Sequence, residues 1–261
     1  MKHIKLYRTK EQAIGQVIET PAIIMANTQN VFAPQSLGEK IELSQDENGE
    51  LVVSIYEEEL PEGVVDLGLP SGLKWASCNI GASKPCEYGK LFQFGRVDGY
   101  AYGDTNHNFH LNVSGGTPTT ASGNTYAVGE VLGPDDDAAH VATNGKLRMP
   151  TKVEIEELLA NTTSQWCQCK DVLGDDHTIH TVYGRLFTSK SDTSKKIFIP
   201  AAGYFNGNGS FGTAGVLCYI WSSSVSTDKV YNSYQLIFNS DNCNCIKRNR
   251  HYGCSVRGVC K

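Results

Sequence analysis

The chain has 261 residues, of which 40% are hydrophobic and 20% are charged, an ordinary balance for a globular protein. Its formal net charge of −5 argues against the broad basic surface that nucleic acid binding needs. No apolar run approaches the roughly 20 residues of a membrane span, and the N-terminus has no signal-peptide pattern. We therefore expect synthesis in the cytoplasm without a signal peptide, no nucleic acid partner and no membrane insertion.

The first 60 residues differ in pattern from the rest. Alternating or β-branched runs predict short strands and a hairpin at residues 3–8, 22–25, 30–33 and 51–56. The acidic run 57–59 and the Pro-Glu-Gly sequence at 61–63 predict a boundary. We expect residues 1–60 to form a small β-rich attachment or oligomerisation segment, because so short a piece holds little core alone.

Residues 61–261 are expected to form one larger domain. Its glycine-rich start predicts strands at 74–76 and 90–95, followed by a long irregular insert at 98–146, a length that usually carries function. One helix is predicted after Pro150, with Thr151 as N-cap, Glu154 completing a capping box, and an apolar face that includes Val153. Further strands are predicted at 182–188, 196–200, 219–223, 234–238 and 255–260. The class expected from this mixture is α+β, loop-rich with short strands.

Four landmarks occur in an order that resembles a known fold group. They are the segments 65–76 (VDLGLPSGLKWA), 148–158 (RMPTKVEIEEL), 198–204 (FIPAAGY) and 221–224 (WSSS). Together they resemble C-type-lectin-fold domains of gut anaerobes, a group that includes formylglycine-generating enzymes and the variable proteins of diversity-generating retroelements. The resemblance spans residues 64–261 and implies a C-type lectin fold. The N-terminal 60 residues resemble, more weakly, the attachment ends of phage or prophage structural proteins.

The tail resembles the variable proteins in particular. In that family, adenines of template codons are randomised, which yields Asn, Asp, Ser, Tyr, His, Cys, Ile, Arg, Thr and Gly but not Lys, Gln, Glu, Met or Trp. Residues 227–254 are dominated by the first group, so Lys229, Gln235 and Lys247 are expected to be frame positions. The resemblance implies a variable region at about 217–254 and a ligand-binding surface made of Tyr219, Thr227, Asp228, Asn232, Asn239, Ser240, Asp241, Asn242, Asn244, Arg248, Asn249, Arg250, His251 and Tyr252.

Burial within the tail is expected to divide sharply. The apolar frame residues Trp221, Leu236, Phe238 and Val256 are predicted to be buried. The unpatterned polar residues between them are predicted to be exposed and to share one face, among them Thr227, Asn239, Asp241, Asn244, Asn249, His251 and Tyr252.

No pattern in the sequence predicts catalysis or a cofactor. The nine cysteines cannot all pair within one chain, and the C-x-C pairs at 167–169 and 243–245 are poorly spaced for zinc. Reduced cysteines are expected, although Cys78 and Cys86 could pair under oxidation. The acidic runs 135–137 and 175–176 are expected to be solvated turns, and His177 and His180 to lie on a surface segment, so no metal site is expected.

The expected function is therefore non-catalytic recognition of a protein or glycan on a cell surface. The chain would work in a phage or prophage particle, as a homo-oligomer, and as a trimer if it belongs to a fibre. One alternative is a structural or adhesin-like module with a fixed ligand. The second is an oxidase of the formylglycine-generating type, which would need reactive thiols among Cys243, Cys245, Cys254 and Cys260.

Overall fold

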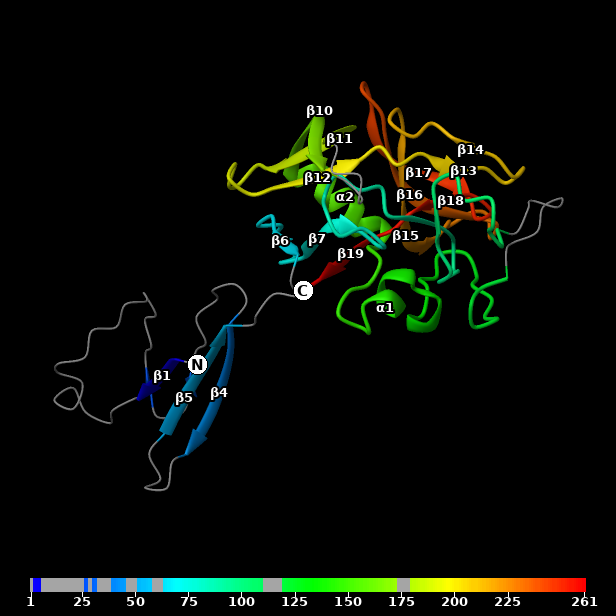
Figure 1. Cartoon of the computed structure of the whole chain (residues 1–261). Coiled ribbons are helices and arrows are strands. Elements are labelled where there is room, and N and C mark those ends of the chain that lie inside the picture. Colours follow the sequence, from blue (N-terminus) through cyan, green and yellow to red (C-terminus); the bar gives the residue numbers. More distant parts are fainter. Residues whose placement is uncertain are drawn as a thin grey trace. The chain divides into compact units, whose positions relative to one another are not determined.

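The computed structural model describes residues 63–109, 119–172 and 179–261, and before them only the strands of the N-terminal segment. The chain divides into two compact units, Met1–Leu60 and Pro61–Lys261. In the first unit, β1 (Lys2–Lys5), β5 (Leu51–Glu57) and β4 (Glu39–Gln45) form an antiparallel sheet in that order (Figure 1). β2 (Ala26–Asn27) pairs with β3 (Asn30–Val31). The residues 6–8, 22–25 and 32–33 of the predicted strands lie outside the described residues.

The second unit is built mainly from β-strands. A large sheet has the order β14-β13-β18-β15-β16-β17, with β8 and β9 attached through β18. Its strands are β8 (Lys90–Gln93), β9 (Tyr100–Ala101), β13 (Tyr204–Phe205), β14 (Phe211–Gly212), β15 (Cys218–Val225), β16 (Asn232–Phe238), β17 (Cys243–Asn249) and β18 (Gly253–Ser255). Two three-stranded sheets accompany it, made of β6 (Val64–Asp66), β7 (Lys74–Asn79) and β19 (Arg257–Cys260), and of β10 (Thr162–Val172), β11 (Ile179–Ser189) and β12 (Lys196–Pro200).

The predicted α+β class is wrong, because strands dominate the described residues. The helices there are the short 3₁₀ turn η2 (Pro134–Asp136), α1 (Ala138–Ala142) and α2 (Lys152–Asn161). Sequence patterning underestimated the strand content. β17 was taken as unpatterned and β10 was not predicted, since neither has the apolar alternation of a half-buried strand. The insert at 98–146 is also not wholly irregular, because it contains β9, η2 and α1.

Both faces of the β15–β16 ribbon are buried. One face, with Ile220, Leu236 and Phe238, packs into a core shared with β7, β12 and α2. The opposite face, with Tyr219 and Trp221, packs into a second core formed with β8, β18 and the η2–α1 region. All eight residues of β15 are buried, so this strand is the central support of the unit. The sequence Cys-Tyr-Ile-Trp places apolar side chains on both faces, as a strand covered on two sides requires.

Helix α2 begins as its capping signal predicts. The Thr151 side chain accepts from the Glu154 N–H, and the Glu154 carboxylate accepts from the Thr151 N–H at 2.8 Å, which completes the capping box. Arg148 adds two hydrogen bonds to the same carboxylate, at 2.8 and 2.5 Å. Val153 is 69% exposed, so its predicted place on the apolar face is wrong; Ile155 and Leu158 provide that face.

Replacing Glu154 by glutamine is expected to lower the unfolding free energy by about 1–2 kcal/mol at pH 7. Burial alone would raise the pKa of Glu154, but hydrogen bonds from Arg148 and Thr151 bring that pKa below its ordinary value of 4.5. A lowered folded-state pKa stabilises the protein above the unfolded-state value, and that stabilisation is lost as the pH falls through the folded-state pKa. Urea unfolding of wild type and Glu154→Gln between pH 3 and 7 measures the difference in unfolding free energy. A difference that stays constant below pH 4 would contradict the assigned role of the Glu154 carboxylate.

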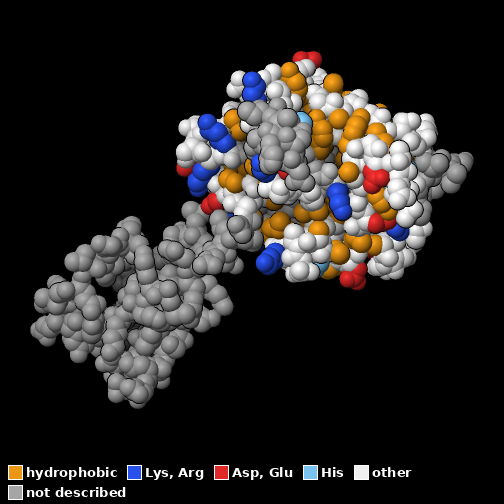
Figure 2. Space-filling view, viewed as in Figure 1, with side chains coloured by type: hydrophobic (Ala, Val, Ile, Leu, Met, Phe, Trp, Pro, Cys, Tyr) orange, Lys and Arg blue, Asp and Glu red, His pale blue; other side chains and the backbone are white. Residues whose placement is uncertain are grey.

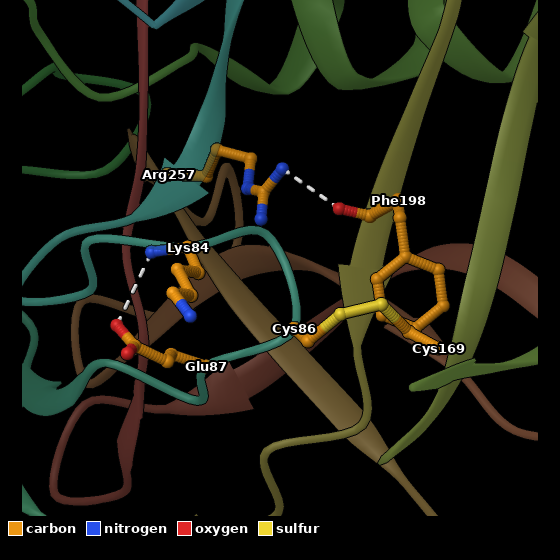
Figure 3. The surroundings of a disulfide bond; sticks show 6 residues. All are labelled: Lys84, Cys86, Glu87, Cys169, Phe198 and Arg257. Carbon is orange, nitrogen blue, oxygen red and sulfur yellow. Dashed lines mark hydrogen bonds between the residues drawn. A yellow bond between two sulfur atoms is a disulfide. The ribbon is translucent and has the colours of Figure 1, made fainter. Parts of the chain in front are cut away.

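One disulfide joins Cys86, in the loop after β7, to Cys169 in β10, across 83 residues of sequence (Figure 3). The expectation of reduced cysteines is therefore wrong for these two, and Cys78, the partner proposed for Cys86, is a free thiol. Cross-linking a loop of this length restricts the unfolded chain, which generally stabilises the folded state.

Candidate functional site

The candidate surface lies on the antiparallel hairpin of β16 and β17. In the described part of the chain β17 ends the large sheet, so one of its edges has no neighbouring strand. Its residues alternate between half-buried and exposed, whereas β16 beside it is mostly buried. The hairpin thus places an exposed edge strand on a buried support.

The predicted frame is confirmed. Trp221, Leu236 and Val256 are fully buried, and Phe238 is 1% exposed. The Trp221 indole N–H donates to the Phe92 carbonyl at 2.8 Å, and its ring meets the Phe94 ring edge-on at 5.6 Å. The hydroxyls of the three following serines also bond the backbone: Ser222 donates to Tyr234 O, Ser223 donates to Pro150 O, and Ser224 accepts from Lys152 N. The Trp-Ser-Ser-Ser motif is therefore a structural anchor.

The fourteen predicted surface residues differ widely in exposure. The exposed ones are Thr227, Asp228, Ser240, Asp241, Asn242 and Asn244. The half-buried ones are Asn232, Asn239, Arg248, Asn249 and Tyr252. Three are buried, Tyr219 at 4%, Arg250 at 3% and His251 at 3% exposed, so the prediction of exposure is wrong for them. Of the frame positions named from codon chemistry, Gln235 is fully buried, whereas Lys229 and Lys247 are exposed.

The prediction that the exposed residues share one face is also wrong. Residues 239–242 form the β16–β17 turn at one end of β17, and residues 249–252 follow its other end. The Thr227 hydroxyl bonds the Tyr234 hydroxyl on the side of the sheet that faces α2, whereas Tyr252 contacts Arg248 on the opposite side. The residues therefore wrap around the sheet edge over the length of β17, roughly 20 Å at 3.3 Å per residue.

The β16–β17 turn is held by its own polar groups. The Asn239 side-chain oxygen accepts from the N–H groups of Asp241 and Asn242, at 2.9 and 2.7 Å. Arg185 of β11 donates to the carbonyls of Asn239 and Ser240. These bonds fix the backbone and leave the Asp241 and Asn242 side chains in solvent, so a change of side chain there leaves the carbonyl contacts in place.

On one side of the edge, Arg248 is surrounded by three tyrosine rings. Its guanidinium carbon lies 3.7 Å from the ring centre of Tyr252, 4.4 Å from Tyr219 and 4.8 Å from Tyr204. The Tyr204 ring lies 5.1 Å from the Tyr219 ring and 5.7 Å from the Tyr252 ring. Tyr204, in β13, was not predicted as a site residue, because nothing in its local sequence shows that β13 lies near the tail.

On the side that faces α2, a charged cluster surrounds Tyr234. The ammonium groups of Lys152 and Lys247 lie 5.3 and 5.7 Å from the centre of its ring. Lys247 pairs with Asp228 at 2.8 Å, and Lys152 pairs with Glu156 at 2.5 Å. The hydrogen bond from Lys247 lowers the pKa of Asp228 to about 2, so this carboxylate is charged at neutral pH. Both lysines on this side therefore already have carboxylate partners.

Arg250 and His251 are buried by contacts that local sequence does not reveal. The Arg250 guanidinium lies 4.8 Å from the centre of the Phe94 ring and donates to the Ser233 hydroxyl at 3.2 Å. The Asn249 side chain bonds both the N–H and the ring Nδ1 of His251. Burial without a charged partner lowers the pKa of Arg250 to about 10. Neither residue belongs to the freely exposed surface.

Three thiols of the tail favour their protonated form. Burial raises the pKa of Cys243 and of Cys254, and it raises the pKa of Cys245 to about 11. A nucleophilic cysteine requires a shift in the opposite direction, toward the thiolate. The described residues contain no group of three or more His, Cys, Asp and Glu side chains placed to hold a metal ion.

The acidic run at 135–137 is not a solvated turn, as the sequence predicted. Asp136 is fully buried and accepts from the hydroxyls of Ser122 and Tyr126, at 2.6 and 2.7 Å. Asp137 caps α1 and accepts from the Met149 N–H at 2.8 Å. These carboxylates organise the insert. The second acidic run, 175–176, and His177 lie outside the described residues, and His180 is exposed.

Two hollows of about 470 and 600 Å³ are lined by residues outside the hairpin, one beside Tyr126 and Glu130 and the other between β7 and the end of α1. Neither collects an acid–base pair. Figure 2 shows basic and acidic side chains interspersed on the visible face of the second unit. No helix in the described part of the chain has the length and apolar character of a membrane span.

Comparison of the chain with protein-family models, curated proteins and solved structures finds no match in any of the three. The family resemblance of the tail therefore remains an expectation from the sequence.

Proposed function

We propose that the second unit is a non-catalytic recognition module whose ligand contacts the β16–β17 edge and its flanking turns, and whose contact residues are diversified by a retroelement. The observation that carries the proposal is the contrast within this hairpin. Fully buried frame residues support an edge strand and turns whose side chains are exposed or half-buried. Sequence changes at an exposed position away from special contacts usually alter stability by less than about 0.5 kcal/mol.

The residue types on the edge suit adaptable recognition. Asn and Ser side chains both donate and accept hydrogen bonds, and Tyr and Arg provide large contact areas with few rotatable groups lost, as in antibody loops. The Cys86–Cys169 disulfide supports work outside the reducing cytoplasm, as on a released particle. Several copies on one particle would strengthen weak single contacts.

A binding assay on cells tests the recognition step. Fluorescently labelled full-length protein is incubated with a panel of bacterial strains and bound protein is counted by flow cytometry. We expect a subset of strains to bind, and the double variant Asn244→Ala, Arg248→Ala to reduce binding about tenfold, since a few contacts dominate most interfaces. Val216→Ser is the control, because Val216 is 58% exposed and is not part of the hairpin. Equal losses for both variants, or binding to no strain, would contradict the proposal.

The fixed-ligand module remains the second candidate. It shares the same exposed edge, so binding alone does not separate the two. A reverse-transcriptase gene near the coding sequence, with a near-copy of the final 120 or so nucleotides, favours diversification; that length is a rough estimate for a domain whose functional positions cluster in one segment. A gene with neither feature favours the fixed-ligand module.

A further inference from the structure

The side of the hairpin that carries Arg248 contains three buried N–H groups without an acceptor. Arg248 Nε, Arg250 Nη2 and Gln235 Nε2 are shielded from solvent and have no hydrogen-bond partner among the described residues. Buried donors without acceptors cost free energy, and they are uncommon in folded proteins. Arg250 is 3% exposed and Gln235 is fully buried, so these are not surface groups that bulk water satisfies.

These groups lie close together on one side of the sheet. Arg248 is paired in register with Ser233, and residues directly opposite on neighbouring strands place their side chains on the same face. The Ser233 hydroxyl is the acceptor for Arg250. Gln235 is the next residue of β16 on that face, and its side-chain oxygen accepts from the Cys254 thiol at 3.4 Å. Two arginines therefore contact one short stretch of β16.

Neither arginine has an acidic partner within the described residues. The ion pairs found there involve Arg96, Arg148, Lys152, Lys195 and Lys247. Arg248 lies among the tyrosine rings, which attract a cation and also keep it partly out of water. A bound anion would supply acceptors for the donors that lack them on both side chains.

We propose that Arg248 and Arg250, with Tyr204 and Tyr252 beside them, bind the carboxylate of an acidic sugar. A planar guanidinium matches a carboxylate with two parallel hydrogen bonds, which a lysine cannot do. The half-buried tyrosines add aromatic faces against which the C–H groups of a sugar ring can pack, and their hydroxyls can bond sugar hydroxyls. This inference rests on the proposed function, because it assigns a ligand chemistry to one side of the same hairpin.

Calorimetric titration of the full-length protein tests the inference with three probes. They are a galacturonate trisaccharide, its methyl ester, and a tripeptide of glutamate. The ester has the same sugar rings without the charge, and the peptide has the charge without the sugar. We expect the acid to bind and the ester to bind at least about tenfold more weakly than the acid. The peptide should also bind more weakly than the acid. Binding of the acid should weaken as salt is added.

Variants of the arginines locate the site. Arg248→Ala and Arg248→Lys should each weaken binding of the acid about tenfold. Lysine keeps the charge but cannot make two parallel hydrogen bonds to one carboxylate. Arg250→Met should weaken binding while leaving the melting temperature unchanged or higher, because it removes a buried cation without a partner and keeps the stem against Phe94. A purely structural arginine would instead lose stability. Lys247→Ala is the control and should change affinity less than about twofold, because Lys247 is on the other side and paired with Asp228.

The outcomes separate this inference from the proposed function. The inference fails if the acid does not bind, if it binds wild type and Arg248→Ala equally, or if the peptide binds better than the sugar. If that happens while the hairpin double variant still loses cell binding, the recognition role stands without an acidic-sugar ligand. If the acid binds at Arg248 but no strain is bound, the site exists and the proposed cell-surface role fails.

Discussion

Replacing Arg257 by alanine is expected to lower the unfolding free energy by about 3–5 kcal/mol. Arg257, in β19, is fully buried and has no carboxylate partner among the described residues. It donates to the side chain of Asn79 at 2.9 Å and to the carbonyls of Ala76 and Ser77 at 3.1 and 3.0 Å. It also donates to the Phe198 carbonyl at 3.0 Å (Figure 3). The side chain thereby joins β19, β7 and β12.

The cost arises because all four acceptors would lose their donor inside the core. Burial lowers the pKa of Arg257 to about 10, which still leaves the guanidinium charged at neutral pH. Arg257→Lys should also be destabilising, since one ammonium group cannot take the positions of the guanidinium N–H groups. For a unit of this size, the alanine variant should melt about 10 °C lower, at 2–4 °C per kcal/mol. Thermal unfolding followed by circular dichroism measures this.

Arg96→Ala is the matched control for Arg257. Arg96 forms a partly exposed ion pair with Asp98 at 2.8 Å, a type of contact that contributes at most about 1 kcal/mol. If Arg257→Ala melts within about 3 °C of wild type, as we expect for Arg96→Ala, the two three-stranded sheets do not depend on this side chain.

Trp221→Ala is expected to cost about 3–5 kcal/mol, because it removes a fully buried ring and leaves a cavity. The substitution also leaves the Phe92 carbonyl without its donor. Tyr252→Ala should cost much less, about 1 kcal/mol, since Tyr252 is half-buried and its ring packs on the Arg248 side chain. Urea unfolding of Trp221→Ala and Tyr252→Ala measures the two losses of unfolding free energy. Equal losses would mean that Tyr252 belongs to the buried frame.

The sequence predicted the supports of the hairpin better than its surface. The capping box of α2, the strand at 196–200 and the four buried frame residues follow from local pattern, because each is an apolar or capping signal within a few residues. β17 was missed because an edge strand at a surface has little to bury on either side, so its residues need no apolar alternation. The α+β class was predicted wrongly for the same reason, because strands without apolar alternation were not recognised.

Burial of polar tail residues could not be predicted in the same way. Arg250 is covered by Phe94 and Ser233, and Tyr219 lies against Tyr204, all partners at a distance in sequence. A prediction based on residue type and local spacing therefore placed Arg250, His251 and Tyr219 on the surface, although all three are buried. The Arg248–tyrosine cluster depends on β13, β15 and the loop after β17 meeting in space, which no local signal indicates.

If the hairpin surface varies while its frame does not, the difference should be visible in the sequences of many copies of the gene. Many copies of the segment encoding residues 217–254 are read from one bacterial or phage population. We predict substitutions at exposed or half-buried positions such as Asn239, Asp241, Asn244 and Asn249, arising where a template codon carries adenine, with Trp221, Leu236 and Phe238 unchanged. A population without such variation, or with substitutions spread equally over frame and surface positions, would contradict the claim.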